Sequence, residues 1–299
     1  MRVVDVTAEF DRFAMATTDM PAEQRIAAFE REIGPIADGF YSRGRRPDDY
    51  DLRVLDTLRS YPGRRDGVLA ISRDFSRLFA SARQKFQSQF GPVSSTHPVY
   101  LLDSMGELDG GTRELRSGAT LLFGADVIAE VHAGKDMTPF FYHELFHVYH
   151  DARVASCFAI YCSLWAEGLA TYAVSRLAPD TDDDGLILNL PRPIRPAVEA
   201  NRAAAVCAVA ARLDSTSDED FNGLFQGDVR LPGFPSRMGY YVGYLVASDI
   251  GRTRDLHALA RMSMQDARPL IDEALARMAT CPEATAEARE RSRTHRISG

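Results

Sequence analysis

Apolar residues recur at steps of three and four positions through most of the first ninety residues of the chain. The spacing is clear within residues 26–36, 52–58 and 75–79. It is the spacing of one face of an α-helix, so it predicts helices between Ala22 and about Phe90. Gly and Pro residues at positions 44–47 and at Pro62-Gly63 indicate breaks between these helices.

The pattern changes between Pro98 and Val131. Val99–Leu102 is a short run typical of a strand, Gly106–Thr112 has the composition of a loop, and Ala119–Phe123 indicates a second strand. Helical spacing returns at Thr138 and continues to the end, with its main interruptions at residues 191–196 and 223–235. This order, without regular alternation of strands and helices, predicts an α+β fold that is mostly helical.

We expect a domain boundary at Gly91-Pro92. Residues 1–91 would then form a helical N-terminal region, and residues 92–299 would form the domain that carries the chemistry. The alternative is one continuous domain, because a chain of 299 residues is long enough for either arrangement.

The composition, with 45% hydrophobic and 26% charged residues, is that of a soluble globular protein. A formal net charge of −7 argues against non-specific nucleic-acid binding, which needs clustered Lys and Arg. The local basic runs Arg43–Arg46 and Arg289–Arg296 are interpreted as solvated surface. No window approaches the roughly 18 to 20 apolar residues of a membrane span, so we expect none.

Acidic residues at positions 5, 9 and 11 interrupt the N-terminal stretch where a signal peptide needs an apolar run. We therefore expect a cytoplasmic protein, or an exported one if a leader is missing from the sequence. The cysteines are scattered without a Cys-x-x-Cys pair, at Cys157, Cys162, Cys207 and Cys281. We expect buried free thiols in a reducing compartment, or one disulfide if the protein is exported.

The strongest chemical signal is the pattern His143-Glu144-x-x-His147. Thr138-Pro139 fits the start of a helix, because Pro is tolerated in the first helical turn. On a helix the two histidines project from one face, one turn apart, so both can bind one metal ion. Glu144 lies about 100° around that helix, where it can accept a proton from water at the metal. The motif therefore predicts two ligands and one base.

Glu167 is the expected third ligand. It lies within Trp165–Tyr172, a segment with helical spacing that follows His147 at a distance allowing a reversal between two antiparallel helices. Two imidazoles and one carboxylate leave a fourth position for water, which is the open coordination of a catalytic zinc site. Trp165 is expected to pack beneath the second helix.

His-Glu-x-x-His followed by this glutamate resembles the pattern of the gluzincin metallopeptidases, the thermolysin-like and aminopeptidase-like clan. Trp165–Tyr172 also resembles the Trp-x-x-Glu-Gly-Phe/Leu-Ala-x-Tyr segment of the alanyl-aminopeptidase type. Over roughly residues 95–250 the chain looks most like a bacterial family of uncharacterised, predicted zinc-dependent proteases. Members of that family have a later Gly-Tyr-Tyr-x-Gly-Tyr element, which here is Gly239–Tyr244.

The resemblance implies a zincin-like core with a small β-sheet, an active-site helix and a second helix that carries the third ligand. It implies that His143, His147 and Glu167 bind Zn²⁺. Glu144 would act as general base in the hydrolysis of a peptide or protein substrate and would later pass the proton to the leaving amine.

Tyr241, Tyr240 and Arg237 are further candidates for the catalytic site. A tyrosine hydroxyl could stabilise the oxyanion of the tetrahedral intermediate, as in related enzymes, and Arg237 could bind a substrate carboxylate or the same oxyanion. The alternative interpretation is structural, with the tyrosines in the core and two glycines of the same segment allowing close helix packing.

The chain departs from the clan's pattern in two places. Thr171 stands where thermolysin-like enzymes have an aspartate that orients the first histidine, so another acceptor is needed, for which Asp151 is the alternative. The Gly-Ala-Met-Glu-Asn strand by which aminopeptidases recognise a free amino terminus is absent, so exopeptidase activity is not expected. Ala119–Asp126 stands in its place and is expected to be an edge strand that pairs with an extended substrate.

The other candidate positions receive structural interpretations. His150 is interpreted as an ordinary histidine at the surface or beside the ligands, the alternatives being a ligand or a proton carrier. Asp180–Gly185 begins like a calcium-binding loop, but Pro191 stands where a bidentate Glu is required, so a solvated turn is expected. The remaining histidines have no partner spacing and are assigned no chemistry: His97, His132, His257 and His295.

The sequence thus predicts a zinc-dependent hydrolase, and more specifically a peptidase. One alternative is a catalytically silent zincin-fold module that binds or regulates, against which the intact Glu144 argues, since a binding module needs only the ligands. The other alternative is a metallohydrolase of a non-peptide amide or ester. The chemistry at zinc is shared by the two enzyme hypotheses, and the shape of the cleft selects the substrate.

Overall fold

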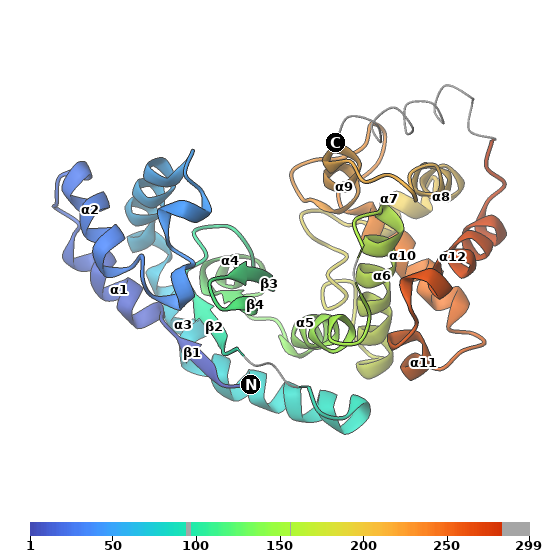
Figure 1. The fold of residues 1–299 in the computed structure, drawn as a ribbon, viewed down its shortest axis with the longest axis horizontal. Coiled ribbons are helices and arrows are strands. Elements are labelled where there is room, and N and C mark those ends of the chain that lie inside the picture. The colour runs from blue at the N-terminus through green and yellow to red at the C-terminus, as the bar shows by residue number, and fades with distance from the viewer. Residues whose placement is uncertain (94–96, 156, 283–299) are drawn as a thin grey trace. The chain divides into compact units, whose positions relative to one another are not determined.

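The computed structural model describes residues 1–93, 97–155 and 157–282 of the chain. The described residues are mostly helical, with one small mixed sheet, which confirms the predicted α+β class (Figure 1). The chain divides into two compact units, Met1–Glu144 and Leu145–Gly299, which are described in turn. The basic run Arg289–Arg296 and His295 lie outside the described residues.

The sheet lies in the first unit and has the order β1-β2-β4-β3. The strands are β1 (Val3–Asp5), β2 (Val99–Leu102), β3 (Gly110–Leu115) and β4 (Gly118–Gly124). β1, β2 and β4 run parallel, and β3 is antiparallel to β4. The predicted strands at 99–102 and 119–123 are confirmed. β1 was not predicted, and β3 begins inside the expected loop.

β4 is an internal strand, so the expectation that Ala119–Asp126 forms an edge strand is wrong. β4 pairs with β2 on one side and with β3 on the other, which uses the hydrogen-bonding groups of both of its edges. From Ala125 the chain is already helical, as the first residue of α4 (Ala125–Val131). The edge on this side of the sheet is β3.

The helices of the first unit are α1 (Thr7–Ala16), α2 (Ala22–Glu32), the short 3-10 turns η1 (Ala37–Gly39) and η2 (Arg43–Arg45), α3 (Tyr50–Phe90) and α4. The predicted break at 44–47 lies between α2 and α3. The break predicted at Pro62-Gly63 is wrong, because α3 continues through it. Pro62 is exposed, so its ring points to solvent and water can solvate the carbonyl group that loses its helical partner.

The predicted boundary at residues 91–92 does not coincide with the division into compact units. β1 precedes that position and β2 follows it, yet the two strands are hydrogen-bonded neighbours in one sheet. The division instead falls between Glu144 and Leu145, inside the helix α5 (Thr138–Asp151).

A cluster of four aromatic residues joins α3, the sheet and the start of α5. Phe75 and Phe79 of α3, Phe123 of β4 and Phe141 of α5 are at most 1% exposed, and their ring centroids lie 5.1 to 5.8 Å apart. Aromatic side chains bury large apolar areas and prefer offset-stacked or edge-to-face arrangements, and both stacked and edge-to-face pairs occur in this cluster. This cluster fixes the first turns of α5 against the sheet.

The second unit is helical throughout its described part. After α5 come α6 (Ile160–Leu177), α7 (Arg195–Glu199), α8 (Arg202–Ala210), α9 (Asp218–Phe225), α10 (Met238–Ile250), α11 (Leu256–Ala260) and α12 (Met264–Met278). α6 and α10 lie side by side (Figure 1). Their closest approach is at Gly168 and Gly243, where a methyl group on either glycine would overlap the backbone of the other helix.

All four cysteines are paired, so the expectation of free thiols is wrong. Cys157 is bonded to Cys162 at the start of α6, and Cys207 in α8 is bonded to Cys281 after α12. The cysteines of each pair are adjacent only in the folded chain, and the second pair is separated by 74 positions in sequence. Spacing without a Cys-x-x-Cys motif therefore did not exclude disulfides.

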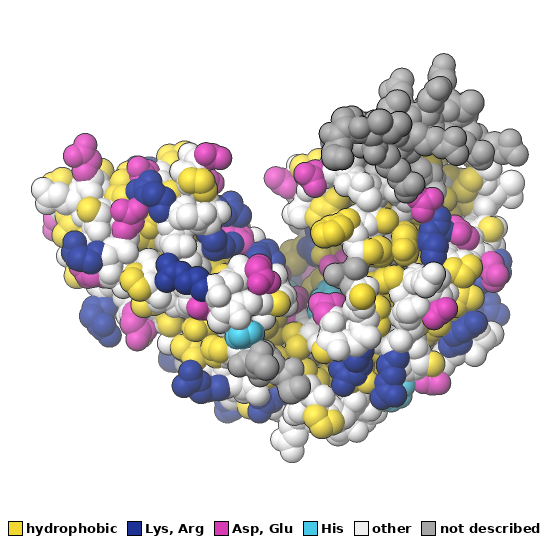
Figure 2. Space-filling model, in the orientation of Figure 1, with side chains coloured by type: hydrophobic (Ala, Val, Ile, Leu, Met, Phe, Trp, Pro, Cys, Tyr) yellow, Lys and Arg dark blue, Asp and Glu magenta, His cyan; other side chains and the backbone are white. Residues whose placement is uncertain are grey.

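Among the described residues, no helix combines the length and the apolar character needed to cross a membrane. On the face shown in Figure 2, basic and acidic side chains are intermixed rather than gathered by sign.

Candidate metal centre

The His-Glu-x-x-His motif lies on α5, as predicted. The helix begins at Thr138, whose backbone N–H donates to Asp136 Oδ1 at 2.9 Å, and Pro139 occupies its first turn. Apolar side chains bury most of the helix, and this burial includes His143, which is 3% exposed, and Glu144, which is 7% exposed. Buried ionisable side chains are uncommon and cluster at functional sites, so their burial points to function.

Glu167 reaches the motif from α6. Only eight residues separate the end of α5 at Asp151 from Ile160, the first residue of α6. The start of α6 is fixed by the Cys157–Cys162 disulfide and by the Ile160 N–H, which donates to the Ser215 carbonyl oxygen at 2.9 Å. Gly168, next to Glu167, makes the closest contact with α10. α6, the helix that carries the third expected ligand, is thus held at its first turn and again beside Glu167.

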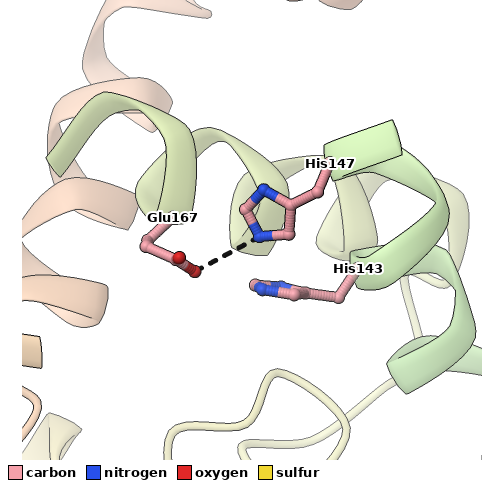
Figure 3. A group of neighbouring side chains, drawn as sticks. All are labelled: His143, His147 and Glu167. Carbon is pink, nitrogen blue, oxygen red and sulfur yellow. Dashed lines mark ion pairs between the residues drawn. The ribbon is translucent and has the colours of Figure 1, made fainter. Parts of the chain in front are cut away.

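The three expected ligands meet in space (Figure 3). His143, His147 and Glu167 each offer one ligand atom, and these atoms all lie within 4.8 Å of one another. His147 Nε2 and Glu167 Oε2 are 3.3 Å apart. Ligand atoms bound tetrahedrally to one zinc ion at about 2.0–2.1 Å are roughly 3.4 Å apart, so the two atoms already have the separation that zinc requires.

The donor set also fits a catalytic zinc ion. Two imidazoles and one carboxylate are the ligands of the thermolysin type of site, and they leave one position open. The side chains of His147 and Glu167 are 17% and 25% exposed, so solvent reaches part of both side chains. The group therefore fits a zinc ion that exchanges water, rather than a closed structural site.

Glu144 follows His143 on α5 and lies against β3. A methyl group on Gly110, the first residue of β3, would be 3.1 Å from both Cγ and Cδ of Glu144. The side chain of Glu144 is therefore bounded by main chain on this side. Sequence reasoning placed Glu144 on the helix but gave no indication of this neighbour.

Thr171 does not take the place of the aspartate found in thermolysin-like enzymes. Its hydroxyl donates to the Glu167 carbonyl oxygen at 2.9 Å, one helical turn earlier in α6. Thr171 thus binds the main chain of the residue that carries the carboxylate ligand. Asp151, the alternative, is exposed at the end of α5, where its charge acts on His150.

His150 is buried and belongs to the packing of the second unit. Its Nδ1–H donates to the Ala260 carbonyl oxygen at 3.0 Å, and its ring stacks on Phe146. Burial lowers the pKa of His150, which keeps the ring neutral. The candidate metal group comprises His143, His147 and Glu167. His150 is 1% exposed, so the interpretation of it as a surface histidine is wrong.

Tyr241 is hydrogen-bonded to Glu199, a residue that the sequence analysis did not identify. Its hydroxyl donates to Glu199 Oε1 at 2.6 Å, and the Arg195 guanidinium lies 4.9 Å from its ring centroid. Burial, with the bond to Glu199, raises the pKa of Tyr241 to about 12, so the phenol stays protonated and can donate. Glu199 and Arg195 lie more than forty positions from Tyr241 in sequence, and no spacing rule connects such distant residues.

Tyr240 and Arg237 contact each other at the start of α10. The Arg237 guanidinium lies 4.3 Å from the Tyr240 ring centroid, and Arg237 itself has a left-handed backbone with φ of 59°. Tyr240 also meets the Phe225 ring edge to face at 6.0 Å. These contacts tie both side chains to the α9–α10 region, and their catalytic roles stay predictions.

The acidic segment Asp180–Gly185 forms a turn held by its own side chains. Asp182 Oδ1 accepts the backbone N–H groups of Asp184 and Gly185, and Asp183 pairs with Arg195 at 2.7 Å. These contacts agree with the expected turn.

No protein-family model, curated protein or solved structure matches this chain. The candidate metal centre therefore rests on the geometry of its own residues and on the motif.

Proposed function

We propose that this protein is a zinc-dependent hydrolase, a metallopeptidase of the gluzincin type with a zincin-like core. The observation that carries the proposal is the meeting of His143, His147 and Glu167, which come from two helices and have ligand atoms within 4.8 Å of one another. A chance His-Glu-x-x-His pattern has no reason to be joined by a glutamate from a second helix.

A bound zinc ion would supply the Lewis acidity that makes water nucleophilic near neutral pH. His143, His147 and Glu167 would hold it. Glu144, beside His143 on α5, would accept the proton of the attacking water and return it to the leaving amine. Burial of Glu144 supports this role, because buried ionisable side chains are uncommon and cluster at functional sites.

A peptide is the substrate class that the sheet favours. β3 is an edge strand, and its first residue, Gly110, lies against Glu144. An extended peptide that paired with this edge would bring its own backbone beside the base. A non-peptide amide or ester would gain nothing from such pairing, and a silent binding module would have no use for Glu144.

The first prediction separates metal binding from catalysis. We expect Glu144→Gln to retain about one zinc ion per chain and to lose turnover, because the amide cannot accept a proton. We expect Glu167→Ala to lose most of its zinc, because one of three ligands is gone. Glu273→Ala, an exposed glutamate on α12, is the control and should change neither property.

Zinc content is measured by elemental mass spectrometry, and turnover by cleavage of a diverse peptide mixture, again read by mass spectrometry. Internal cuts in the mixture would support an endopeptidase, and terminal trimming an exopeptidase. Zinc binding without any cut would favour the binding module or the other hydrolase. Full activity of Glu144→Gln would remove Glu144 from the mechanism.

A further inference from the structure

His132 is a buried histidine to which the sequence assigned no chemistry. It follows α4, is 5% exposed, and its Nε2 lies 3.0 Å from Asp109 Oδ2. Since an ionised carboxylate only accepts, the Nε2–H of His132 donates this hydrogen bond. The ring also stacks on Phe140 in the first turn of α5, with centroids 4.5 Å apart and planes at 26°. His132 thus connects Asp109 to the helix that carries the motif.

Asp109 holds the peptide segment at the start of β3 through three oxygen atoms. One carboxylate oxygen binds His132, and the other accepts the Gly110 N–H at 2.8 Å. Its carbonyl oxygen accepts the Gly124 N–H at 2.9 Å, which joins it to the end of β4. These bonds hold the Asp109–Gly110 peptide to the end of β4 and to His132.

Gly110 in turn lies against the proposed base. A methyl group at this position would be 3.1 Å from Cγ and Cδ of Glu144 and 2.7 Å from Cζ of Phe140. The glycine therefore allows a contact that an alanine would disturb. A catalytic carboxylate must be held to within about 0.5 Å of its productive position, and a fixed backbone surface restricts it in this way.

We propose that Asp109 and His132 are positioning residues for Glu144 and that they act through Gly110. The chain of contacts runs from His132 to Asp109, from Asp109 to the Gly110 peptide, and from Gly110 to the Glu144 side chain. His132 also holds Phe140, which precedes Glu144 by one turn of α5. The proposal rests on the proposed function, since it needs Glu144 to be the base at a metal centre.

The experiment uses the full chain loaded with Co²⁺, whose visible absorption reports the ligands at the metal. The probe is acetohydroxamate, which chelates a metal and gives up a proton that a correctly placed Glu144 can accept. Its affinity is measured for wild type, His132→Gln, Glu144→Gln and the double variant. His257→Gln, the same exchange at an exposed histidine, is the control.

We expect His132→Gln to keep its Co²⁺, because no ligand is changed, and to bind acetohydroxamate about 3- to 30-fold more weakly, as is usual for coupled neighbours. In the Glu144→Gln background the same exchange should have no further effect, because the group that it positions is gone. A merely structural histidine would weaken binding equally in both backgrounds.

Equal weakening in both backgrounds, no weakening, or loss of Co²⁺ from His132→Gln would each overturn the positioning role and leave the proposed function intact. A wild-type protein that takes up no Co²⁺ would overturn both proposals. If His132→Gln does not fold, Gly110→Ala replaces it in the same cycle. That variant keeps the Asp109–His132 pair and disturbs the contacts of Gly110 with Glu144 and with Phe140, so it must show the same dependence on Glu144.

Discussion

Asp103 is a fully buried carboxylic acid at the end of β2. Arg64 Nη1 lies 2.8 Å from its Oδ2 and 3.4 Å from Oδ2 of the buried Asp126, so one guanidinium serves two carboxylates. Asp126 is further satisfied by the backbone N–H groups of Ser104 and Gly106. Burial, together with the charge of Asp126, raises the pKa of Asp103 to about 7.

This raised pKa predicts how stability depends on pH. Between pH values of about 4 and 7 the folded state keeps a proton on Asp103 that the unfolded state releases, so the free energy of unfolding falls as pH rises through this window. The slope from one such group is at most about 1.4 kcal/mol per pH unit. Asp103→Asn removes this contribution, so we expect its free energy of unfolding to fall less, or rise more, with pH than that of wild type.

Urea unfolding at a series of pH values measures these slopes. Asp19→Asn replaces an exposed carboxyl and should retain the slope of the wild type. Parallel profiles of Asp103→Asn and wild type between pH 4 and 7 would mean that Asp103 is ionised throughout this range. Burial would then raise the pKa of Asp103 less than inferred.

At the scale of single residues, the sequence predicted the grouping of the three candidate ligands better than it predicted their neighbours. The spacing of His143, His147 and Glu167 follows from helical geometry, and the structure brings the three together. The partners of these residues come from distant parts of the chain, as with Gly110 beside Glu144. Such neighbours depend on tertiary packing, for which a single sequence carries no periodic signal.

At the scale of elements, the packing of α6 on α10 determines where Glu167 lies. At Gly168 and Gly243 the two helices meet backbone to backbone, without side chains between them. The structural interpretation of Gly243 as a position of close helix packing is therefore confirmed. A close approach of this kind leaves no space for even one methyl group.

We therefore expect Gly168→Ala to lower the free energy of unfolding by about 1–3 kcal/mol, the usual cost of overpacking, and to lower zinc affinity by displacing α6. Gly63→Ala is the matched control, because Gly63 is exposed in α3 and has no atom within 4 Å of the added methyl group. There the better helix propensity of alanine should raise stability by about 0.5–1 kcal/mol. Thermal melts measure the stability of the two variants, and zinc titrations measure their zinc affinity. Equal changes in Gly168→Ala and Gly63→Ala would argue against the close contact at Gly168.

Of the two strands that the sequence missed, β1 and β3, the first is stabilised by pairing with distant residues. β1 has only three residues, which is too short for an apolar pattern to show. Its partner β2 lies almost a hundred positions later, so no local signal indicates the pairing. β3 begins with two glycines, which indicated a loop. The helices from Ala22 and from Thr138 were predictable because their apolar spacing is local. The predicted break at Pro62 failed because an exposed proline can remain inside a long, packed helix.

At the scale of the whole molecule, the two disulfides bear on the compartment. Disulfides persist in oxidising compartments and are rare in the cytoplasm. The cytoplasmic location stays a prediction, and the paired cysteines argue for export instead.

We expect iodoacetamide to label no cysteine of the native protein and all four after denaturation and reduction. Loss of the Cys207–Cys281 bond by serine substitution should lower the free energy of unfolding by about 4 kcal/mol, and loss of the Cys157–Cys162 bond by about 2 kcal/mol, because the longer loop restricts the unfolded chain more. Mass spectrometry counts the labelled cysteines, and urea unfolding measures the free energy of unfolding. Labelling of the native protein would show that a pair is open in solution.

Phe158 lies between the two cysteines of the short disulfide and is 94% exposed, in the connection from α5 to α6. It is the kind of site that a digestive protease with aromatic specificity cuts first. Cys157 would then stay on the fragment with His143 and His147, and Cys162 on the fragment with Glu167. The disulfide would keep both fragments in one covalent molecule, so a nick at the most accessible aromatic residue would appear only on a reducing gel.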